Sequence, residues 1–271
     1  MNNITIKMFY ITLLAITFLS FTTYGQNLEA SFSLGYGVGI LKSDFGFNRT
    51  RTNNTDVRDY VSYSLGKGTR INAGATYQLK ENIKAGLDIG YQIGGKTKSV
   101  ETDLRTAPTL VKTTTIKSNT LSFVPNITLS LSNDGFAPYL KTGLFLGFPK
   151  IKLHERDEAI STSSRDTKYS KSTAFGIYNA VGAHMEMFGL KFFGELFANL
   201  ASYNTKYSEI TSVIVNGTEE ISNFNVKSLQ TVYLKNYDRG KNIPNTQPDE
   251  ELRIKMPFSA IGFKIGVKYG F

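Results

Sequence analysis

The feature that most constrains this chain is an alternation of apolar with small or polar residues at every second position. It predicts β-strands rather than helices, because successive side chains of a strand point to opposite faces. A strand that crosses a bilayer needs about 9 to 11 residues, and the alternating segments have about this length. The pattern gives about eight strands, at 32–40, 70–79, 83–93, 121–131, 140–148, 175–187, 190–200 and 261–271.

The connections between these segments alternate between short and long. Three are tight turns with turn-forming residues, at 80–82, 132–135 and around Phe188-Gly189. Four are long and polar, at about 43–67, 97–118, 152–171 and 207–252. Within the last of these, the Asn216-Gly217 pair predicts a hairpin that projects beyond the membrane. Short turns at one end and long loops at the other are typical of an up-and-down outer-membrane β-barrel.

The composition of the two faces indicates which face would touch lipid. One face carries Leu, Ile, Val, Phe and Tyr, and the other is mostly Gly, Ser, Thr and Asn with scattered charges. An eight-stranded barrel has little interior space, which suits the small residues, so the bulky face is expected to point outward. A secreted soluble β-barrel remains the alternative. Interfacial aromatic girdles are expected at Tyr77, Tyr139, Phe148, Phe192, Tyr203 and Phe258.

The N-terminus resembles a secretory signal peptide. Lys7 precedes an almost wholly apolar run from Met8 to Phe21, and small or polar residues follow up to Gly25. This run is shorter than the roughly 20 residues of a spanning helix, which argues against the alternative of a membrane anchor. The chain contains no Cys, so a lipid-anchored lipoprotein is not expected. We therefore expect a signal peptide at 1–25, followed by one β-barrel domain at 26–271.

The end of the chain carries a family resemblance. Lys264, Gly266, Tyr269 and Phe271 form a last strand that ends on alternating aromatics. This pattern resembles the small eight-stranded outer-membrane β-barrels of Gram-negative envelopes, the OmpA/OmpX-like barrels, and segments 136–148 and 192–207 look like strands of the same domain. The resemblance implies an outer-membrane location and a C-terminal signal that the barrel-assembly machinery reads. It says little about activity.

The sequence offers little catalytic chemistry. With no Cys, and with His154 and His184 as the two histidines, neither a thiolate site nor a multi-His metal cluster is possible, and we expect no metal and no cofactor. His184 and Glu186 share the parity that faces the lumen, but no nucleophile motif lies beside them. A structural role for this pair is the better interpretation, so we expect that the chain is not an enzyme.

A layer of paired charges is expected to fill the lumen. Asp88, Lys141 and Glu195 each lie five residues after the start of a strand that leaves a short turn, and all three have inward parity. Residues from alternate strands of a small barrel meet in layers. Lys264 and Arg70 have inward parity on neighbouring strands and could supply further cations. Such a network would replace an apolar core and block ion flow.

The chain is basic, with a formal charge of +9. In an exported protein this favours anionic headgroups over nucleic acid, so membrane lipid and lipopolysaccharide are the expected partners. The loops carry basic residues that could bind a specific anion or face headgroup phosphates and solvent, namely Arg49, Arg51, Arg58, Lys96, Lys98, Lys112 and Lys117.

The expected function is that of a structural or interaction protein that displays long loops at the cell surface, with a protein partner bound through residues 207–252. Two alternatives remain open. One is a narrow channel for small solutes, although channels generally need more strands. The other is a membrane-embedded hydrolase, for which a catalytic constellation is missing.

Overall fold

The computed structural model describes residues 28–105, 108–131, 135–158, 162–238, 240 and 242–271. The expected signal peptide at 1–25 and part of the predicted turn at 132–135 lie outside these residues. The described residues form an all-β protein, in which seventeen strands belong to one sheet. Two short helical segments, α2 (Val226–Leu229) and a 3-10 turn at Ile221–Asn223, complete it. No helix in the described part of the chain has the length and apolar content that a membrane span requires.

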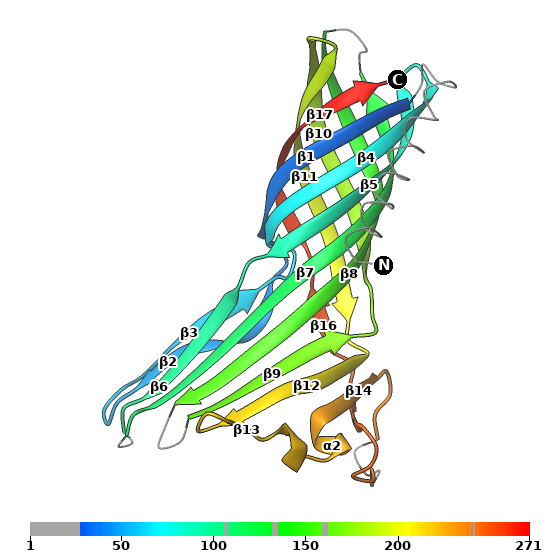
Figure 1. Cartoon of the computed structure of the whole chain (residues 1–271). Helices are drawn as coiled ribbons and strands as arrows, with labels where there is room; N and C mark the ends of the chain where they lie inside the picture. Colours follow the sequence, from blue (N-terminus) through cyan, green and yellow to red (C-terminus); the bar gives the residue numbers. More distant parts are fainter. Residues whose placement is uncertain (1–27, 106–107, 132–134, 159–161, 239, 241) are drawn as a thin grey trace, which may run out of the picture.

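Eight strands close into a ring, the barrel, which Figure 1 shows. Each pairs in antiparallel fashion with the next, and β17 returns to pair with β1, for example through Phe32 and Val267. The eight strands are β1 (Leu28–Gly39), β4 (Gly68–Lys80), β5 (Ile83–Gly94), β7 (Leu110–Ser130), β8 (Phe136–Glu158), β10 (Ala174–Met187), β11 (Leu190–Asn204) and β17 (Ala260–Gly270). The ring leaves no free edge, because the last strand satisfies the hydrogen-bonding groups of the first.

The expected long loops are mostly strands, so that prediction was wrong. Residues 110–118 of β7 and 150–158 of β8 continue past the ring, where β6 (Thr97–Asp103) pairs with β7 and β9 (Thr162–Ser170) pairs with β8. Three more strands extend this sheet: β2 (Ser43–Arg51) pairs with β6, β3 (Asp56–Tyr63) with β2, and β12 (Tyr207–Val215) with β9. We call this open sheet the extension (Figure 1). Polar but β-branched stretches such as Thr113–Ile116 continue the ladder because a paired backbone does not require an apolar side chain.

A small cap follows the extension. It contains β13 (Thr218–Glu219), α2, β14 (Gln230–Leu234) and β15 (Asp249–Leu252), and β16 (Lys255–Pro257) leads back to the barrel. The hairpin predicted at Asn216-Gly217 is confirmed: it joins β12 to β13, with φ of 51° and 84° at the two turn residues. Positive φ at both positions is what a two-residue hairpin turn requires.

The barrel end opposite the extension carries short turns and the C-terminus (Figure 1). Phe188 and Gly189 link β10 to β11 with φ of 54° and 75°, and Glu81-Asn82 link β4 to β5. One end of the barrel is therefore nearly bare, whereas the other bears the extension and the cap.

Apolar side chains cover the outside of the barrel, and the inside contains small and polar residues together with buried aromatic rings such as Phe145 and Phe197. Leu87, Leu144 and Leu196 point outward and are 42%, 50% and 64% exposed. The aromatic residues divide between the two faces. Tyr77, Phe148 and Phe192 are exposed, whereas Tyr139, Tyr203 and Phe258 are buried, so their predicted place in an outer girdle was wrong. These three rings fill space that the small inward residues leave open.

The polarity of the two faces inverts along β8. Within the barrel Leu144 faces outward and Lys141 inward, but in the extension Lys152 faces outward and Ile151 is fully buried on the inner side. The change lies between Phe148 and Lys150. Strand β7 inverts in the same way, with Leu121 and Lys117 on the outer face and Thr120 and Ile116 on the inner face.

Candidate functional site

The lumen of the barrel contains a chain of ion pairs, which we call the lumen network. Lys141 Nζ lies 3.2 Å from Asp88 Oδ2 and 2.8 Å from Glu195 Oε1, and Lys264 Nζ lies 2.6 Å from Glu195 Oε2. The four residues come from four different strands, β5, β8, β11 and β17. All are buried, with exposed fractions of 8% or less. The structure thus brings together four of the five residues that the sequence singled out.

Arg70 faces the lumen but stands apart from these ion pairs. Its guanidinium donates to the carbonyl oxygen of Gly66 at 3.2 Å and lies 4.7 Å from the centre of the Phe197 ring. A cavity of about 10 Å³ lies among Arg70, Asp88 and Lys264, roughly the room that one water needs. Side chains therefore occupy the lumen at the level of the network.

A second cluster of charges lies nearer the bare end of the barrel, and sequence reasoning missed it. Glu29 accepts hydrogen bonds from Lys84 at 2.9 Å and from Lys191 at 2.7 Å. The signal was available: each of these residues is the second residue of its strand, and each has inward parity. Their positions follow from register across three strands, β1, β5 and β11, which the sequence alone did not supply.

His184 and Glu186 do not form a pair. The His184 side chain is buried near the ring of Tyr139, at 6.0 Å between ring centroids, whereas Glu186 is exposed at the end of β10. Lys268 lies over the same Tyr139 ring, 4.3 Å from its centre. His184 therefore packs among aromatic and cationic groups of the lumen, and the weak hydrolase hypothesis based on this pair has no geometric support.

The residues between the barrel and the extension close the lumen at that end. The Leu65 amide donates to the carbonyl oxygen of Pro257, and Ser64 Oγ donates to the carbonyl oxygen of Ser259 at 2.6 Å. Phe258 is fully buried and packs against the ring of Phe145. These contacts tie two connecting segments across the rim.

The tip of the extension is held by exposed ion pairs. Arg49 and Arg58 both donate to the Asp56 carboxylate, and these hydrogen bonds hold its pKa well below the usual range. Arg105 donates to Asp103 at 2.7 Å, which lowers the pKa of that carboxyl to about 2. Arg51 also lies 3.6 Å from Asp103. Arg49, Arg51 and Arg58, which were expected to face anions, are therefore paired with carboxylates within the extension.

His154 and Asp166 form a pair on the outer face of the extension, with 2.7 Å between Nδ1 and Oδ1. Thr115 lies directly opposite His154 in the β7–β8 register. Among the described residues, no group of three or more His, Cys, Asp or Glu is arranged to hold a metal ion.

The residues of the expected assembly signal divide by face. Lys264 points into the lumen, and Tyr269 is 51% exposed on the outside. The Tyr269 and Phe271 rings pack edge to face at 5.0 Å, and the Phe271 amide donates to the carbonyl oxygen of Leu28. The final residue therefore joins the last strand to the beginning of the first.

No protein-family model matches the chain, and no curated protein matches it. Comparison with solved structures finds similarity to the crystal structure of the outer membrane protease OmpT from Escherichia coli. The identity is 12%, the TM-score is 0.28, and the match covers 90% of this chain and 97% of that one. Membership of the OmpA/OmpX-like barrels thus stays an expectation from the sequence.

The comparison corrects one expectation. The sequence led us to expect that the chain is not an enzyme, but the matched structure is that of a protease, so that expectation is withdrawn. At a TM-score of 0.28 the likeness carries no argument for any particular reaction of this chain.

Proposed function

We propose that this chain is an integral outer-membrane β-barrel protein with a filled lumen, and that it displays the extension and the cap outside the bilayer. The observation that carries this proposal is the closed ring with apolar side chains outside and ion-paired charges inside. A soluble barrel would place its apolar residues in the lumen. An apolar outer face is favourable only where hydrocarbon covers it.

The inversion of polarity on β7 and β8 supports the position of one membrane boundary. Up to Phe148 the outer face of β8 is mostly apolar, and from Lys150 onward it is charged, while the inner face is apolar at Ile151 and Leu153. A surface needs apolar residues wherever it meets lipid and polar residues wherever it meets water. We place the outer boundary of the bilayer between these two residues, with the extension at the cell surface and the bare end in the periplasm.

Insertion into lipid tests this proposal. The mature protein, refolded into phosphatidylcholine vesicles, should become resistant to protease across the barrel strands while the extension is cut. A protein that stays in the aqueous fraction with a protected extension would contradict it. The same preparation in a planar bilayer should not conduct steadily, because side chains fill the lumen; a steady ion current would favour the channel instead.

The C-terminal contacts support a role in assembly. Phe271 joins the last strand to the first, and the pattern of Lys264, Gly266, Tyr269 and Phe271 resembles the signal read by the barrel-assembly machinery. Removing Phe271 should lower the yield in the outer membrane and leave periplasmic aggregates, as immunoblots of membrane fractions would show. Normal membrane levels of the truncated protein would reject this role.

The cap and the adjoining strand, residues 207–252, are the proposed place for an envelope protein partner. Phe224, Tyr237 and Leu252 are large side chains exposed there, at 41%, 37% and 60%. A crosslinking pull-down from intact cells, with and without residues 207–252, tests this partner. Recovery of the same partner without the segment would contradict the proposal.

A further inference from the structure

The outer face of the extension carries lysines directly opposite one another. Lys117 on β7 faces Lys152 on β8, and Lys152 faces Lys168 on β9. We call these three residues the lysine row. Neighbouring strands lie about 4.8 Å apart, and like charges directly opposite each other destabilise a sheet. The ion pairs of the described residues include none of the three. Lys168 also faces Glu209 on β12, whereas Lys152 has a lysine on either side. An anion that lies across the row would offset this repulsion.

An open cleft of about 690 Å³ lies beside the lysine row. Its charged lining comprises five cations (Lys96, Lys98, Lys117, Lys152, Arg156) and two carboxylates (Glu158, Asp166), a difference of +3 with His154 neutral. The two carboxylates already have partners, because Glu158 is paired with Arg156 and Asp166 with His154. Arg156 and Glu158 cancel, so the difference of +3 is that of the four lysines less Asp166, and it suits a ligand with more than one phosphate.

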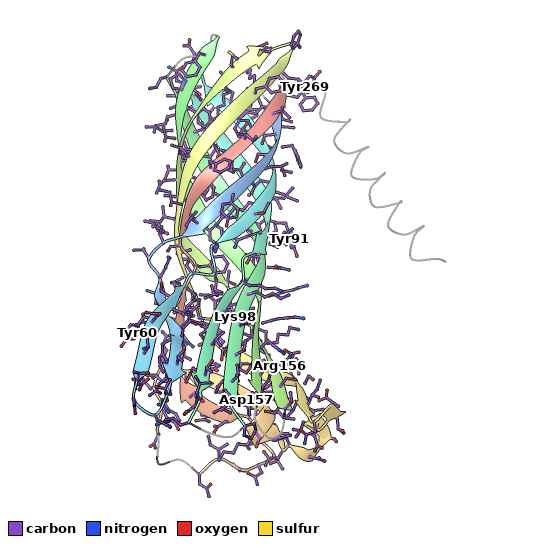
Figure 2. All side chains as sticks on the ribbon, turned by 90° about the vertical axis from the view of Figure 1, so that its left-hand side faces the viewer. Tyr60, Tyr91, Lys98, Arg156, Asp157 and Tyr269 are labelled. Atoms are coloured by element: carbon purple, nitrogen blue, oxygen red, sulfur yellow. The ribbon has the colours of Figure 1, made fainter. Side chains whose placement is uncertain are left out.

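The position of the cleft indicates the source of that anion. Lys152 lies four residues after Phe148 on the same face of β8, about 13 Å along the strand. On β7, Lys117 is likewise four residues from the outward Leu121. Figure 2 shows Tyr91 on the barrel and Lys98 just beyond it toward the extension. An anion bound here lies at the edge of the apolar band, within reach of a headgroup whose acyl chains cover that band.

We propose that the lysine row and Lys96 and Lys98 bind the phosphate groups of a membrane glycolipid in the leaflet that borders the extension. This inference rests on the proposed placement of the barrel in a bilayer. Each ammonium would donate to phosphate oxygens, and such charge-assisted hydrogen bonds are stronger than neutral ones. The bound phosphates would offset the like-charge repulsion across β7, β8 and β9, and this binding would hold the protein at a fixed depth in the membrane.

The test uses the mature protein in phosphatidylcholine nanodiscs doped with lipid A that carries two phosphates. Native mass spectrometry counts the lipid A molecules that each variant retains. The Lys117→Gln/Lys152→Gln variant should bind at least about tenfold more weakly, because each lost charged hydrogen bond is worth about a factor of ten or more. The matched control is Lys112→Gln/Lys235→Gln, which removes two charges elsewhere: Lys112 lines a cleft on the other face of the extension. The control should bind like the parent.

Three results would overturn the proposal. The first is equal retention of lipid A by the lysine-row variant and the parent, or an equal loss in the control. The second is equal binding of lipid A from which both phosphates have been removed. The third is displacement of lipid A by millimolar inorganic phosphate, which would indicate a site for free phosphate. If the parent fails to enter the nanodiscs, the proposed function fails, and lipid A binding in detergent micelles still tests the lysine row separately.

Discussion

The barrel and the extension share two strands, β7 and β8, but each of these strands turns its apolar side chains to opposite faces in the two regions. In the barrel, β8 turns Leu144 outward and buries Lys141, whereas in the extension it turns Lys152 outward and buries Ile151. The backbone ladder is continuous through the change, so hydrogen bonding does not distinguish the two regions. The two regions differ in what surrounds them in the proposed placement, which is lipid for the barrel and water for the extension. Buried ion pairs hold the inside of the barrel, and buried apolar contacts hold the inner face of the extension.

The largest expected effect comes from breaking the lumen network. Glu195→Gln removes the carboxylate that Lys141 and Lys264 share, and stranding buried partners typically costs about 3 to 5 kcal/mol. The free energy of unfolding in lipid vesicles, measured with urea, checks this value. Adding Lys141→Met should recover part of the loss, because one stranded cation is then removed. Simple addition of the two effects would show that the charges are not coupled.

The next effect contrasts two exposed apolar side chains. Leu196 on the barrel and Tyr60 on β3 are 64% and 80% exposed, and Figure 2 shows Tyr60 on the extension. Leu196→Arg should cost about 2 to 4 kcal/mol in a bilayer, because a cation would face hydrocarbon. Tyr60→Arg should change stability by less than about 0.5 kcal/mol, because the side chain faces water. Equal costs for the two variants would contradict the assignment of the lipid face.

A smaller change in stability is expected when one methyl group is deleted in each of the two regions. Ile116 is 3% exposed on the inner face of the extension, whereas Ile127 points outward from the barrel and is 48% exposed. Ile116→Val should cost about 0.5 to 1.5 kcal/mol, because it removes buried contacts. Ile127→Val should be nearly neutral, because lipid fills the space. Hydrogen exchange of the β7 amides measures the loss of stability in each variant. A larger loss for Ile127→Val than for Ile116→Val would contradict this prediction.

The smallest effect concerns the pH dependence of the extension tip. The hydrogen bonds from Arg49 and Arg58 lower the pKa of Asp56, and Arg105 lowers that of Asp103 to about 2 from an ordinary 3.8. A carboxyl with a lowered folded pKa stabilises the fold above its unfolded pKa, and that contribution is lost as pH falls through the folded pKa. The β2–β3 hairpin should therefore lose exchange protection between about pH 4 and pH 2. Asp56→Asn should flatten that change; an unchanged profile would show that these pairs do not hold the tip.

Much of the barrel could be predicted from sequence, because alternation over about ten residues reports local strand geometry and needs no knowledge of neighbours. Each of the eight predicted segments overlaps one strand of the ring. The inward parity of Asp88, Lys141, Glu195 and Lys264 followed from the same pattern. Glu29, Lys84 and Lys191 had the same parity but were missed, because their proximity depends on the stagger of three strands around a closed ring.

The extension could not be predicted from pattern. Its strands mix charged and Thr-rich stretches that contain no consistent apolar alternation, and they pair because β7 and β8 already hold their neighbours in register. The burial of Tyr139, Tyr203 and Phe258 escaped prediction for a related reason, since aromatic composition near a strand end does not say which way a ring points.

The sequence by itself determined that this chain forms strands, where most of the barrel strands lie and which side chains share a face, because these properties repeat every two residues along the chain. The tertiary structure alone decided which charges meet, where the outer face changes from apolar to basic, and which lysines stand opposite one another. Those properties depend on closing the ring at one register, because a shift of a single residue would move every side chain to the other face.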